Sequence, residues 1–340
     1  MIQNQWSLVG MTAVLTICLC LGIARAVDKV VTVGYQLVYN PWNVAIVSGE
    51  FESATGYDIN WRKFDSGSKV LAAMAAGDVQ IALAGSSPIV TGVSRGLDLQ
   101  LFWIAADIAS AEALVVRHGS GIVAPQDLKG KRLAVPFVST AHLHVLFALE
   151  QFGIDAAHLT ILNMQPSQIE AAWLRGDIDA AFVWGPVLNA VKQTGHVLIA
   201  SDELNRWGQP TFDGMVVDRT FAETHGEFMV VFVRVLSRAN AAYRDHPRDW
   251  TPDSDRVRAI VEIVGGNPED VPLMLARYAF PSLKEQASCL WLGCRQQGGA
   301  ARALQRTARF LKDQKKIPAL QPDYSKFVTS AYVEAALKHP

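Results

Sequence analysis

This chain of 340 residues lacks several motifs and an excess of either charge, and each absence excludes a function. The charges nearly cancel, with 31 Lys and Arg against 32 Asp and Glu and a net charge of −1, so no basic field exists to hold nucleic acid or anionic lipid. No G-x-x-x-x-G-K-[ST] phosphate loop is present, and no G-x-G-x-x-G follows the first strand. The chain is therefore not expected to hydrolyse ATP itself, and no cofactor is expected.

Cysteine is scarce, and two of the four cysteines, Cys18 and Cys20, lie in an apolar stretch from Val9 to Ala24. The stretch is about 16 residues long, which is shorter than the roughly 20 needed to span a bilayer. It ends in Ala24-Arg25-Ala26, which is similar to a signal-peptidase site, although no Lys or Arg precedes it. We expect residues 1–26 to be a signal peptide cleaved near Ala26 on export to the periplasm, with an uncleaved anchor as the alternative.

The two remaining cysteines, Cys289 and Cys294, stand close together in SCLWLGC. In an oxidising compartment such a pair favours a local disulfide, but the sequence leaves open whether the two are joined. A lone C-x4-C without a second pair of ligands is a weak metal signal. The eight His are scattered, and His142 and His144, two residues apart, point to different faces of a helix. No metal site is expected.

What the chain does contain is an internal repeat. Residues 69–78 read KVLAAMAAGD and residues 168–177 read QIEAAWLRGD, and the copies continue as GDVQIALAGSSP and GDIDAAFVWGP. Each copy predicts a helix that stops at Gly-Asp, a buried strand and a turn that opens the next helix. A period near one hundred residues is too long for a solenoid. The repeat therefore predicts two similar α/β lobes with a cleft between them.

The rest of the pattern extends this interpretation. Strands are expected at 29–36, 57–64, 99–106, 132–135 and 196–200, helices at 43–54, 228–243 and 302–312, and the alternation predicts parallel, helix-flanked sheets. Two segments, Glu112–Arg117 and Asp213–Asp218, are interpreted as connections between the lobes. We expect residues 27–115 with 215–340 to form lobe one and residues 116–214 to form lobe two, with the C-terminal helices packed on lobe one.

Three turns at expected strand ends carry hydroxyl groups. They contain Ser66 in DSGS, Ser86 and Ser87 in GSSP, and Ser139 and Thr140 in VST. Ligands of open α/β sheets lie beyond the carboxyl ends of the strands, where helix N-termini present free N–H groups. Each turn alone is explained as an N-cap that stabilises its helix by about 1 kcal/mol. Three such turns from both lobes predict a site for a compact oxyanion.

A second group of candidates consists of two carboxylates and an aromatic residue. Glu112 and Asp213 begin the two connecting segments, and at the floor of a cleft both would accept hydrogen bonds from an ammonium group. The alternative is that each is an exposed hinge residue or pairs with a nearby Arg. Trp184 ends the second repeat strand and is expected to line the cleft, with core packing as its alternative. Tyr39, Trp42 and Trp207 are weaker candidates for further walls, since packing in the core or on the surface explains each.

These blocks together resemble the taurine-binding periplasmic proteins of bacterial ABC transporters, within the family that binds alkanesulfonates, nitrate and taurine. The resemblance runs from about Val31 to Val333, and it is carried by WRKFDSGS, GDVQIALAGSSP, EALVV, GKRLAVPFVSTAH, RGDIDAAFVWGP and WGQPTFD. It implies a type II periplasmic binding protein, with two α/β lobes joined by two crossover segments around a ligand cleft. It also implies partners, namely an ABC permease and its ATPase in the inner membrane.

Carried onto this chain, the resemblance implies a role for each site residue. The sulfonate would contact Ser66, Ser86, Ser87, Ser139 and Thr140, the amine would contact Glu112 and Asp213, Trp184 would form a wall, and Gln36 completes the set. The chain departs from the family after Gln36, where Leu37, Val38 and Tyr39 replace small hydroxyl residues. It departs again between Ser282 and Gly299.

Two alternatives to a taurine-binding protein stay open from the sequence. The first is the same fold binding an alkanesulfonate or an aromatic sulfonate, which the residues Leu37 to Tyr39 keep open. The second is an enzyme on this scaffold, such as a desulfinase. An enzyme needs a nucleophile or an acid–base group in the cleft, and His142 is the sole candidate.

Overall fold

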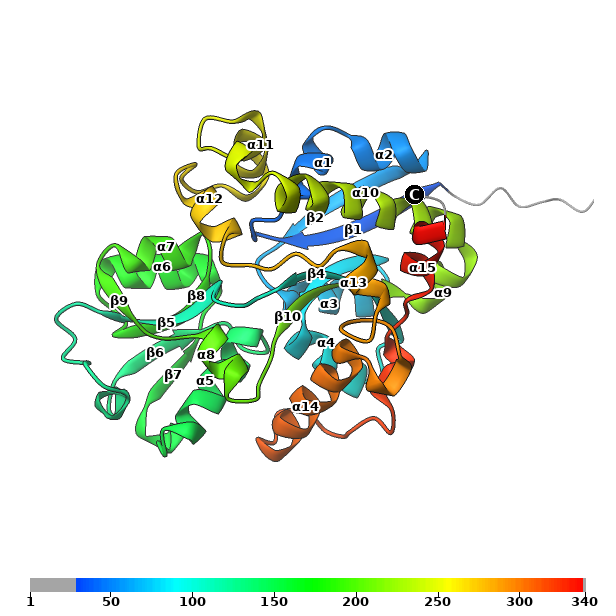
Figure 1. Ribbon diagram of the computed structural model, residues 1–340. Coiled ribbons are helices and arrows are strands. Elements are labelled where there is room, and N and C mark those ends of the chain that lie inside the picture. The colour runs from blue at the N-terminus through cyan, green and yellow to red at the C-terminus, as the bar shows by residue number, and fades with distance from the viewer. Residues whose placement is uncertain (1–28, 339–340) are drawn as a thin grey trace, which may run out of the picture.

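The computed structural model describes residues 29–338, which form two lobes (Figure 1). The predicted signal peptide, with Cys18, Cys20 and its cleavage site, lies outside the described residues. No helix within residues 29–338 has the length and apolarity that crossing a membrane requires. The strands are β1 Val30–Gln36, β2 Asp58–Phe64, β3 Ile81–Gly85, β4 Leu99–Asp107, β5 Glu112–Arg117, β6 Arg132–Val135, β7 Thr160–Asn163, β8 Ala180–Trp184, β9 Gly195–Ala200 and β10 Phe212–Asp218.

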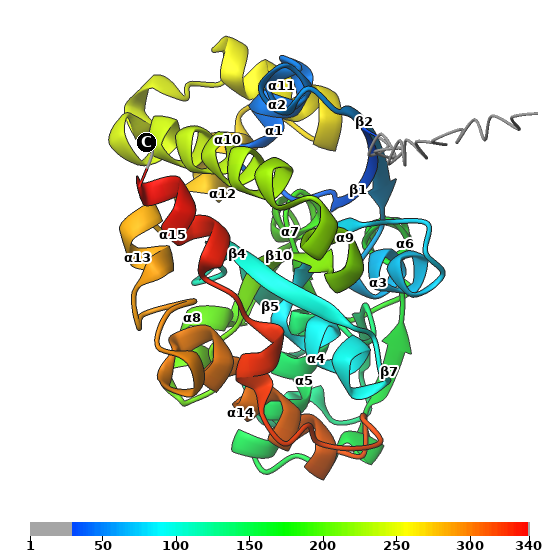
Figure 2. The same cartoon turned by 90° about the vertical axis from the view of Figure 1, so that its right-hand side faces the viewer.

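Helices surround both sheets and also form most of the C-terminal third of the chain. They are α1 Asn43–Val47, α2 Glu50–Thr55, α3 Gly67–Ala75, α4 Ser86–Ser94, α5 Thr140–Gln151, α6 Pro166–Arg175, α7 Val187–Lys192, α8 Ser201–Arg206, α9 Arg219–Thr224, α10 Gly226–Asp245, α11 Asp255–Val264, α12 Asp270–Leu275, α13 Leu283–Ala287, α14 Gly299–Asp313 and α15 Ala331–Lys338. In Figure 2, α10, α14 and α15 lie over lobe one. Phe228, Phe232 and Leu304 are buried in the same core cluster as the strands of lobe one.

The internal repeat is visible in the strand order. One sheet has the order β2-β1-β3-β10-β4 and belongs to lobe one; the other has the order β7-β6-β8-β5-β9 and belongs to lobe two. Position by position the two orders match, with β3 and β8, the repeat strands, in the centre. In both copies a glycine follows the preceding helix in the left-handed region, Gly77 at φ 84° and Gly176 at φ 81°, which a residue with a Cβ rarely adopts.

The expectation of parallel sheets is corrected in one strand of each lobe. In lobe one, β10 runs antiparallel to both β3 and β4, and in lobe two β5 runs antiparallel to both β8 and β9. Both are the strands that follow a crossing between lobes. Such a strand starts at the cleft edge, where the strands β3 and β8 end, and it therefore runs the opposite way.

Sheet membership shows where the chain crosses. The first crossing lies between β4 and β5 and the second lies between α8 and β10. These points precede the predicted boundaries at 115/116 and 214/215 by a few residues, because β5 and β10 already belong to the lobe that they enter. The predicted boundaries stay a proposal about where the lobes separate when they move.

A third link connects the lobes, beyond the two that the sequence indicated. From α11, which packs on α1 of lobe one, the chain continues to α12, where Met274 lies next to Gly185 of lobe two. The chain then returns beside the first crossing, and Asp107 and Ala279 exchange backbone hydrogen bonds with N···O distances of 2.8 and 3.1 Å. Three neighbouring segments therefore connect the two lobes.

The predicted helix over 43–54 is broken. It forms two short helices, α1 and α2, because Gly49 between them adopts φ 66°.

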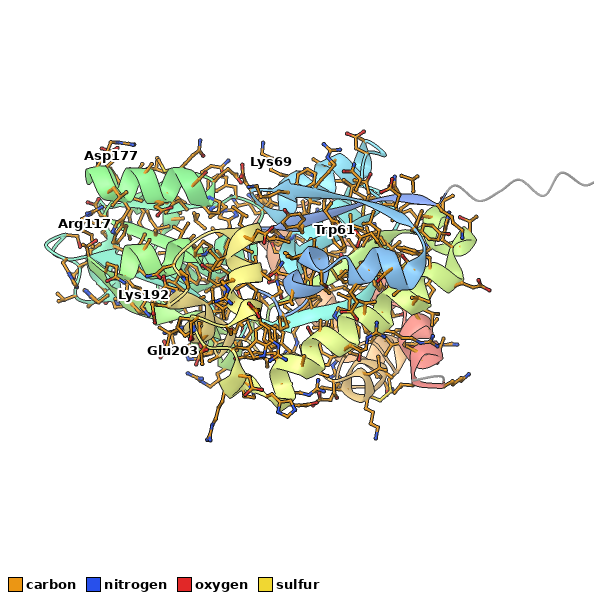
Figure 3. All side chains as sticks on the ribbon, turned by 90° about the horizontal axis from the view of Figure 1, so that it is seen from above. Trp61, Lys69, Arg117, Asp177, Lys192 and Glu203 are labelled. Carbon is orange, nitrogen blue, oxygen red and sulfur yellow. A yellow bond between two sulfur atoms is a disulfide. The ribbon has the colours of Figure 1, made fainter. Side chains whose placement is uncertain are left out.

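Charged side chains such as Arg117 and Asp177 lie on the outside of lobe two, and Trp61 belongs to lobe one (Figure 3).

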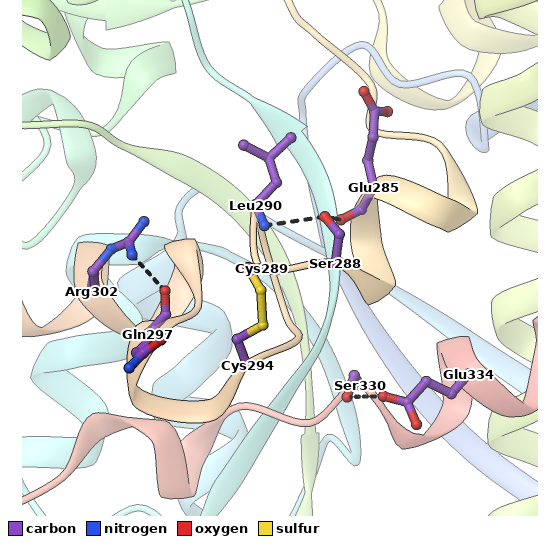
Figure 4. The surroundings of a disulfide bond; sticks show 9 residues. All are labelled: Glu285, Ser288, Cys289, Leu290, Cys294, Gln297, Arg302, Ser330 and Glu334. Atoms are coloured by element: carbon purple, nitrogen blue, oxygen red, sulfur yellow. Dashed lines mark hydrogen bonds between the residues drawn. A yellow bond between two sulfur atoms is a disulfide. The ribbon is translucent and has the colours of Figure 1, made fainter.

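Cys289 and Cys294 are joined by a disulfide in a loop between α13 and α14 (Figure 4). The Leu290 N–H donates to Ser288 Oγ at 3.1 Å within this loop. The loop carries the exposed Leu290 and the buried Leu292, so it is anchored on lobe one.

Candidate ligand-binding cleft

A small cavity lies between the lobes and is called the inner cavity below. Its volume is about 10 Å³, room for roughly one water molecule. A larger ligand therefore enters only when the lobes separate. The lining residues come from both lobes and from the third link, and they are Gln36, Val38, Gly67, Gly85, Pro88, Glu112, Ser139, Thr140, Trp184, Asp213 and Tyr278.

Six of the nine residues predicted for the site line this cavity, namely Gln36, Glu112, Ser139, Thr140, Trp184 and Asp213. The other three, Ser66, Ser86 and Ser87, are buried directly beside the lining residues Gly67, Gly85 and Pro88. The nine residues are thus brought together at one place, although they come from seven separate stretches of the sequence.

The two carboxylates occupy equivalent positions of the two lobes. Asp213 on β10 stands opposite Gly85, the last residue of β3, and Glu112 on β5 stands opposite Trp184, the last residue of β8. Both are nearly fully buried, with exposures of 8% and 4%. Neither forms a salt bridge with a Lys, Arg or His among the described residues.

Because both carboxyl groups are buried without a cation beside them, their pKa values are raised. Burial raises the pKa of Glu112 to about 8; the hydrogen bond from Thr140 works against this rise and the Asp213 charge adds to it. Burial also raises the pKa of Asp213 to about 7. A positive charge placed between the two carboxylates would lower both pKa values and stabilise their ionised forms.

The hydrogen bonds leave part of this polar lining without partners. Thr140 Oγ1 donates to Glu112 Oε1 at 2.6 Å, which joins α5 to β5 inside lobe two. Glu112 Oε2 and Ser86 Oγ are buried and have no hydrogen-bond partner. Since a buried polar group without a partner costs about 1–3 kcal/mol, these atoms indicate where a ligand donates and accepts.

Three helices begin at the cleft. Ser66 precedes α3, Gly85 precedes α4 and Ser139 precedes α5, and each helix is at least nine residues long. The first N–H groups of a helix have no partner within the helix and favour an anion. Ser139 Oγ caps its own helix by accepting from the His142 N–H at 3.0 Å and donates to the Pro136 carbonyl at 2.6 Å. The converging helix ends thus bring N–H groups without helical partners to the cleft.

The residues of the turn after β1 lie in three different environments. Gln36 Nε2 donates to the Leu83 carbonyl at 2.9 Å, which fixes the end of β1 against β3. Val38 lines the inner cavity, Leu37 lines a neighbouring cavity, and the Tyr39 hydroxyl donates to the Gly265 carbonyl at 3.1 Å. Of the three residues that depart from the family pattern, Val38 alone lines the inner cavity.

Tyr278 is a lining residue that sequence reasoning missed. It lies on the returning part of the third link, and burial raises the pKa of its hydroxyl well above the usual value, with the Asp213 and Glu112 charges adding to the rise. The rule that ligands lie at the ends of strands points only to the turns that follow strands, and Tyr278 lies in a loop that follows the helix α12. No motif in ARYAF marks this loop as part of a cleft, so the sequence carried no signal for it.

The remaining candidates are located elsewhere. The His142 ring stacks on Phe137 at a centroid distance of 4.4 Å, does not line the inner cavity, and has its pKa lowered to about 4 by burial, with Lys316 contributing. Trp42 is fully buried in the core and Trp207 is 48% exposed on lobe two. No group of three or more His, Cys, Asp or Glu within residues 29–338 is arranged to hold a metal ion.

A family model described as NMT1/THI5 like matches residues 41–249 of this chain. The chain belongs to the NMT1/THI5-like family. This family member is 39% identical over 311 residues to the taurine-binding periplasmic protein of Escherichia coli (strain K12), with 92% of this chain and 94% of that protein covered.

Solved structures show the same fold. The alkanesulfonate-binding protein SsuA from Xanthomonas axonopodis pv. citri bound to MOPS superposes with a TM-score of 0.71 at 23% identity, over 90% of this chain and 97% of that one. The periplasmic aliphatic sulphonate-binding protein SsuA from Escherichia coli gives 0.71 at 22% identity, over 90% and 99%. The predicted type II periplasmic binding fold is confirmed. Because a relative that is 39% identical along 92% of this chain is a periplasmic binding protein, this family member is a solute-binding protein rather than an enzyme.

Proposed function

We propose that this chain is the solute-binding component of an ABC importer and that it captures taurine or a close aminosulfonate. The observation that carries the proposal is the pair of buried carboxylates, Glu112 and Asp213, on the floor of the cleft at which three helices begin. The carboxylates suit an ammonium group and the helix ends suit a sulfonate. A short zwitterion satisfies both sides at once.

The partners and the location follow from this role. The mature chain, from about residue 27, is free in the periplasm, and it delivers its ligand to a permease that an ATPase drives from the cytoplasmic side. The likeness to a periplasmic taurine-binding protein along 92% of the chain supports this assignment.

A sulfonate without an amine is the second candidate, and Val38 favours it because an apolar residue replaces a hydroxyl group beside the ligand. Such a ligand would leave Glu112 and Asp213 facing no positive charge. Closing the cleft on an anion would then require both carboxyls to be protonated, because burying like charges together is unfavourable. The aminosulfonate therefore fits the site better.

Isothermal titration calorimetry of residues 27–340 tests the proposal, with taurine and ethanesulfonate as the two ligands. The expected result is one-to-one binding with taurine preferred by at least tenfold. Binding of ethanesulfonate or a bulkier sulfonate without binding of taurine would contradict the aminosulfonate assignment and move the specificity to the turn Leu37–Tyr39.

A further inference from the structure

We propose that a cavity at the hinge is a second binding site, separate from the ligand cleft, and that it takes an organic ammonium with an aromatic body. The hinge is the group of three segments that connect the lobes, and this space is called the hinge cavity. Its volume is about 520 Å³, which is typical of small-molecule sites. Its lining comes from the end of β4, the end of α10, the segment from α12 to α13 and the disulfide loop, and no described residue of lobe two contributes to it.

The hinge cavity lies against two of the three connections between the lobes. Asp107 is at the start of the first crossing, and Tyr278 and Ala279 belong to the third link. Backbone hydrogen bonds of 2.8 and 3.1 Å between Asp107 and Ala279 hold the two segments together. Tyr278 also lines the inner cavity, and it is the one residue that the two cavities share. A molecule in the hinge cavity therefore contacts the segments that join the lobes, outside the cleft itself.

Aromatic side chains form a large part of the lining. The Phe280 ring centroid lies 5.4 Å from that of Tyr243 and 6.0 Å from that of Tyr278. Trp291 of the disulfide loop lines the same cavity, and next to it Leu290 is 57% exposed and points away from the disulfide (Figure 4). The face of an aromatic ring carries negative potential and attracts a cation, and its edge packs against other rings. The lining therefore suits an aromatic group and favours a positive charge on it.

The cationic side chain of the lining, Arg244, already has acidic partners. It forms a salt bridge with the adjacent Asp245 at 3.3 Å. Glu285 lines the cavity as well, and its Oε2 accepts from the Ser282 N–H and hydroxyl at 2.7 and 2.8 Å. These hydrogen bonds, with the Arg244 charge contributing, hold the pKa of Glu285 below its usual value. Arg244 therefore offers little to an anionic ligand.

Asp107 is the charged group of the lining that lacks a counterion. No Lys, Arg or His within residues 29–338 forms a salt bridge with it, and its Oδ1 accepts one hydrogen bond, from the Ala109 N–H at 3.2 Å. Burial raises the pKa of Asp107, as expected for a carboxylate without a cation beside it. An ammonium would supply the counterion and a charge-assisted hydrogen bond, whereas a carboxylate or sulfonate would add a second negative charge. Charge therefore selects an ammonium.

The experiment is a calorimetric titration of the protein, produced from its full sequence, with three probes of similar shape and different charge. They are tryptamine, which is a cation, tryptophol, which is neutral, and indole-3-propionate, which is an anion. Tryptamine is expected to bind one-to-one and at least tenfold more tightly than tryptophol, and indole-3-propionate is expected not to bind. The binding of tryptamine is expected to persist when taurine is present at saturation, because the two sites are separate.

Variants then locate the site. Asp107→Asn removes the charge and keeps the shape, so it is expected to reduce the preference for tryptamine over tryptophol to less than threefold. Glu285→Gln is the matched control, because the Glu285 carboxylate already has partners, and it is expected to keep a preference of at least fivefold. Trp291→Ala removes an aromatic wall and is expected to weaken tryptamine and tryptophol alike, by at least fivefold.

Four results would refute the site. They are no binding of tryptamine, equal binding of tryptophol, an unchanged preference in Asp107→Asn, and competition between tryptamine and taurine, which would place tryptamine in the ligand cleft. If Asp107→Asn does not fold, Trp291→Ala decides, since an unchanged tryptamine affinity in that variant also refutes the site. None of these results depends on whether taurine itself binds, so the proposed function stands or fails separately.

Discussion

At the scale of single residues, the two buried carboxylates are the groups whose replacement separates an aminosulfonate from a plain sulfonate. We expect Glu112→Gln and Asp213→Asn to weaken taurine by about 10- to 100-fold, because each removes a charge-assisted hydrogen bond that contributes about 1.5–3 kcal/mol. Ethanesulfonate is expected to keep its affinity or to gain, since each change removes a negative charge beside an anion. Calorimetry with both ligands measures the difference.

The matched control for these substitutions is Asp177→Asn. Asp177 lies on the outside of lobe two, pairs with Arg175 at 2.7 Å and does not line the inner cavity. Its replacement is expected to leave both affinities within twofold. Equal losses of taurine and ethanesulfonate in the Glu112 and Asp213 variants would contradict charge pairing.

The raised pKa values of Glu112 and Asp213, about 8 and about 7, predict opposite pH dependences for the two ligands. An ammonium favours ionised carboxylates, so taurine affinity is expected to rise from pH 6 to pH 8 and binding is expected to release protons. A sulfonate without an amine favours the protonated carboxyls, so its affinity is expected to fall over the same range. Calorimetry in buffers of different ionisation enthalpy counts the protons. A flat taurine profile would mean that the two groups are already ionised without ligand.

At the scale of elements, the disulfide loop is expected to stabilise the fold of lobe one without affecting the binding of the ligand. Cys289 and Cys294 are five positions apart, and closing so short a loop stabilises a fold by about 2 kcal/mol in the chain-entropy model. The variant Cys289→Ser/Cys294→Ser is expected to melt roughly 3–6 °C lower. Its taurine affinity is expected to stay within twofold, because neither cysteine lines the inner cavity. A loss of affinity at unchanged melting temperature would link the loop to the cleft.

The sequence predicted elements well where local signals were strong. The repeat predicted α3–β3 and α6–β8 with their terminal glycines. Strand ends selected Ser139, Thr140 and Trp184, the connecting segments selected Glu112 and Asp213, and these five residues line one cavity with Gln36, which the family resemblance added. The sequence did not predict that β5 and β10 run antiparallel, because strand direction depends on how the chain crosses between lobes. The break at Gly49 and the position of Tyr278 likewise depend on long-range packing that periodicity does not report.

At the scale of the whole molecule, closure brings the two lobes into contact at Gly85. A Cβ at this residue would lie 2.8 Å from Thr140 Cγ2 of the other lobe, while the backbone of Gly85, at φ −70° and ψ 161°, accepts any residue. Gly85→Ala is therefore expected to leave lobe one folded, to oppose closure and to weaken taurine by about 5- to 100-fold, which corresponds to about 1–3 kcal/mol of overpacking.

A compensating change makes this prediction specific. Adding Thr140→Ser removes the Cγ2 methyl group and keeps the hydroxyl that donates to Glu112, so the double variant is expected to regain most of the affinity. Small-angle X-ray scattering with and without taurine measures closure as a fall in the radius of gyration. If Gly85→Ala closes normally, or if Thr140→Ser restores nothing, the two lobes do not meet at this point.

The order of the strands also has a consequence for how the molecule is made. Lobe two is a continuous segment, from β5 to β9, so all of its strands leave the ribosome together. In lobe one, by contrast, β10 lies between β3 and β4, and β4 has no strand to pair with in its own sheet until residues 212–218 have been synthesised. Lobe two is therefore free to fold first. The sheet of lobe one stays incomplete until β10 is available to pair with β3 and β4.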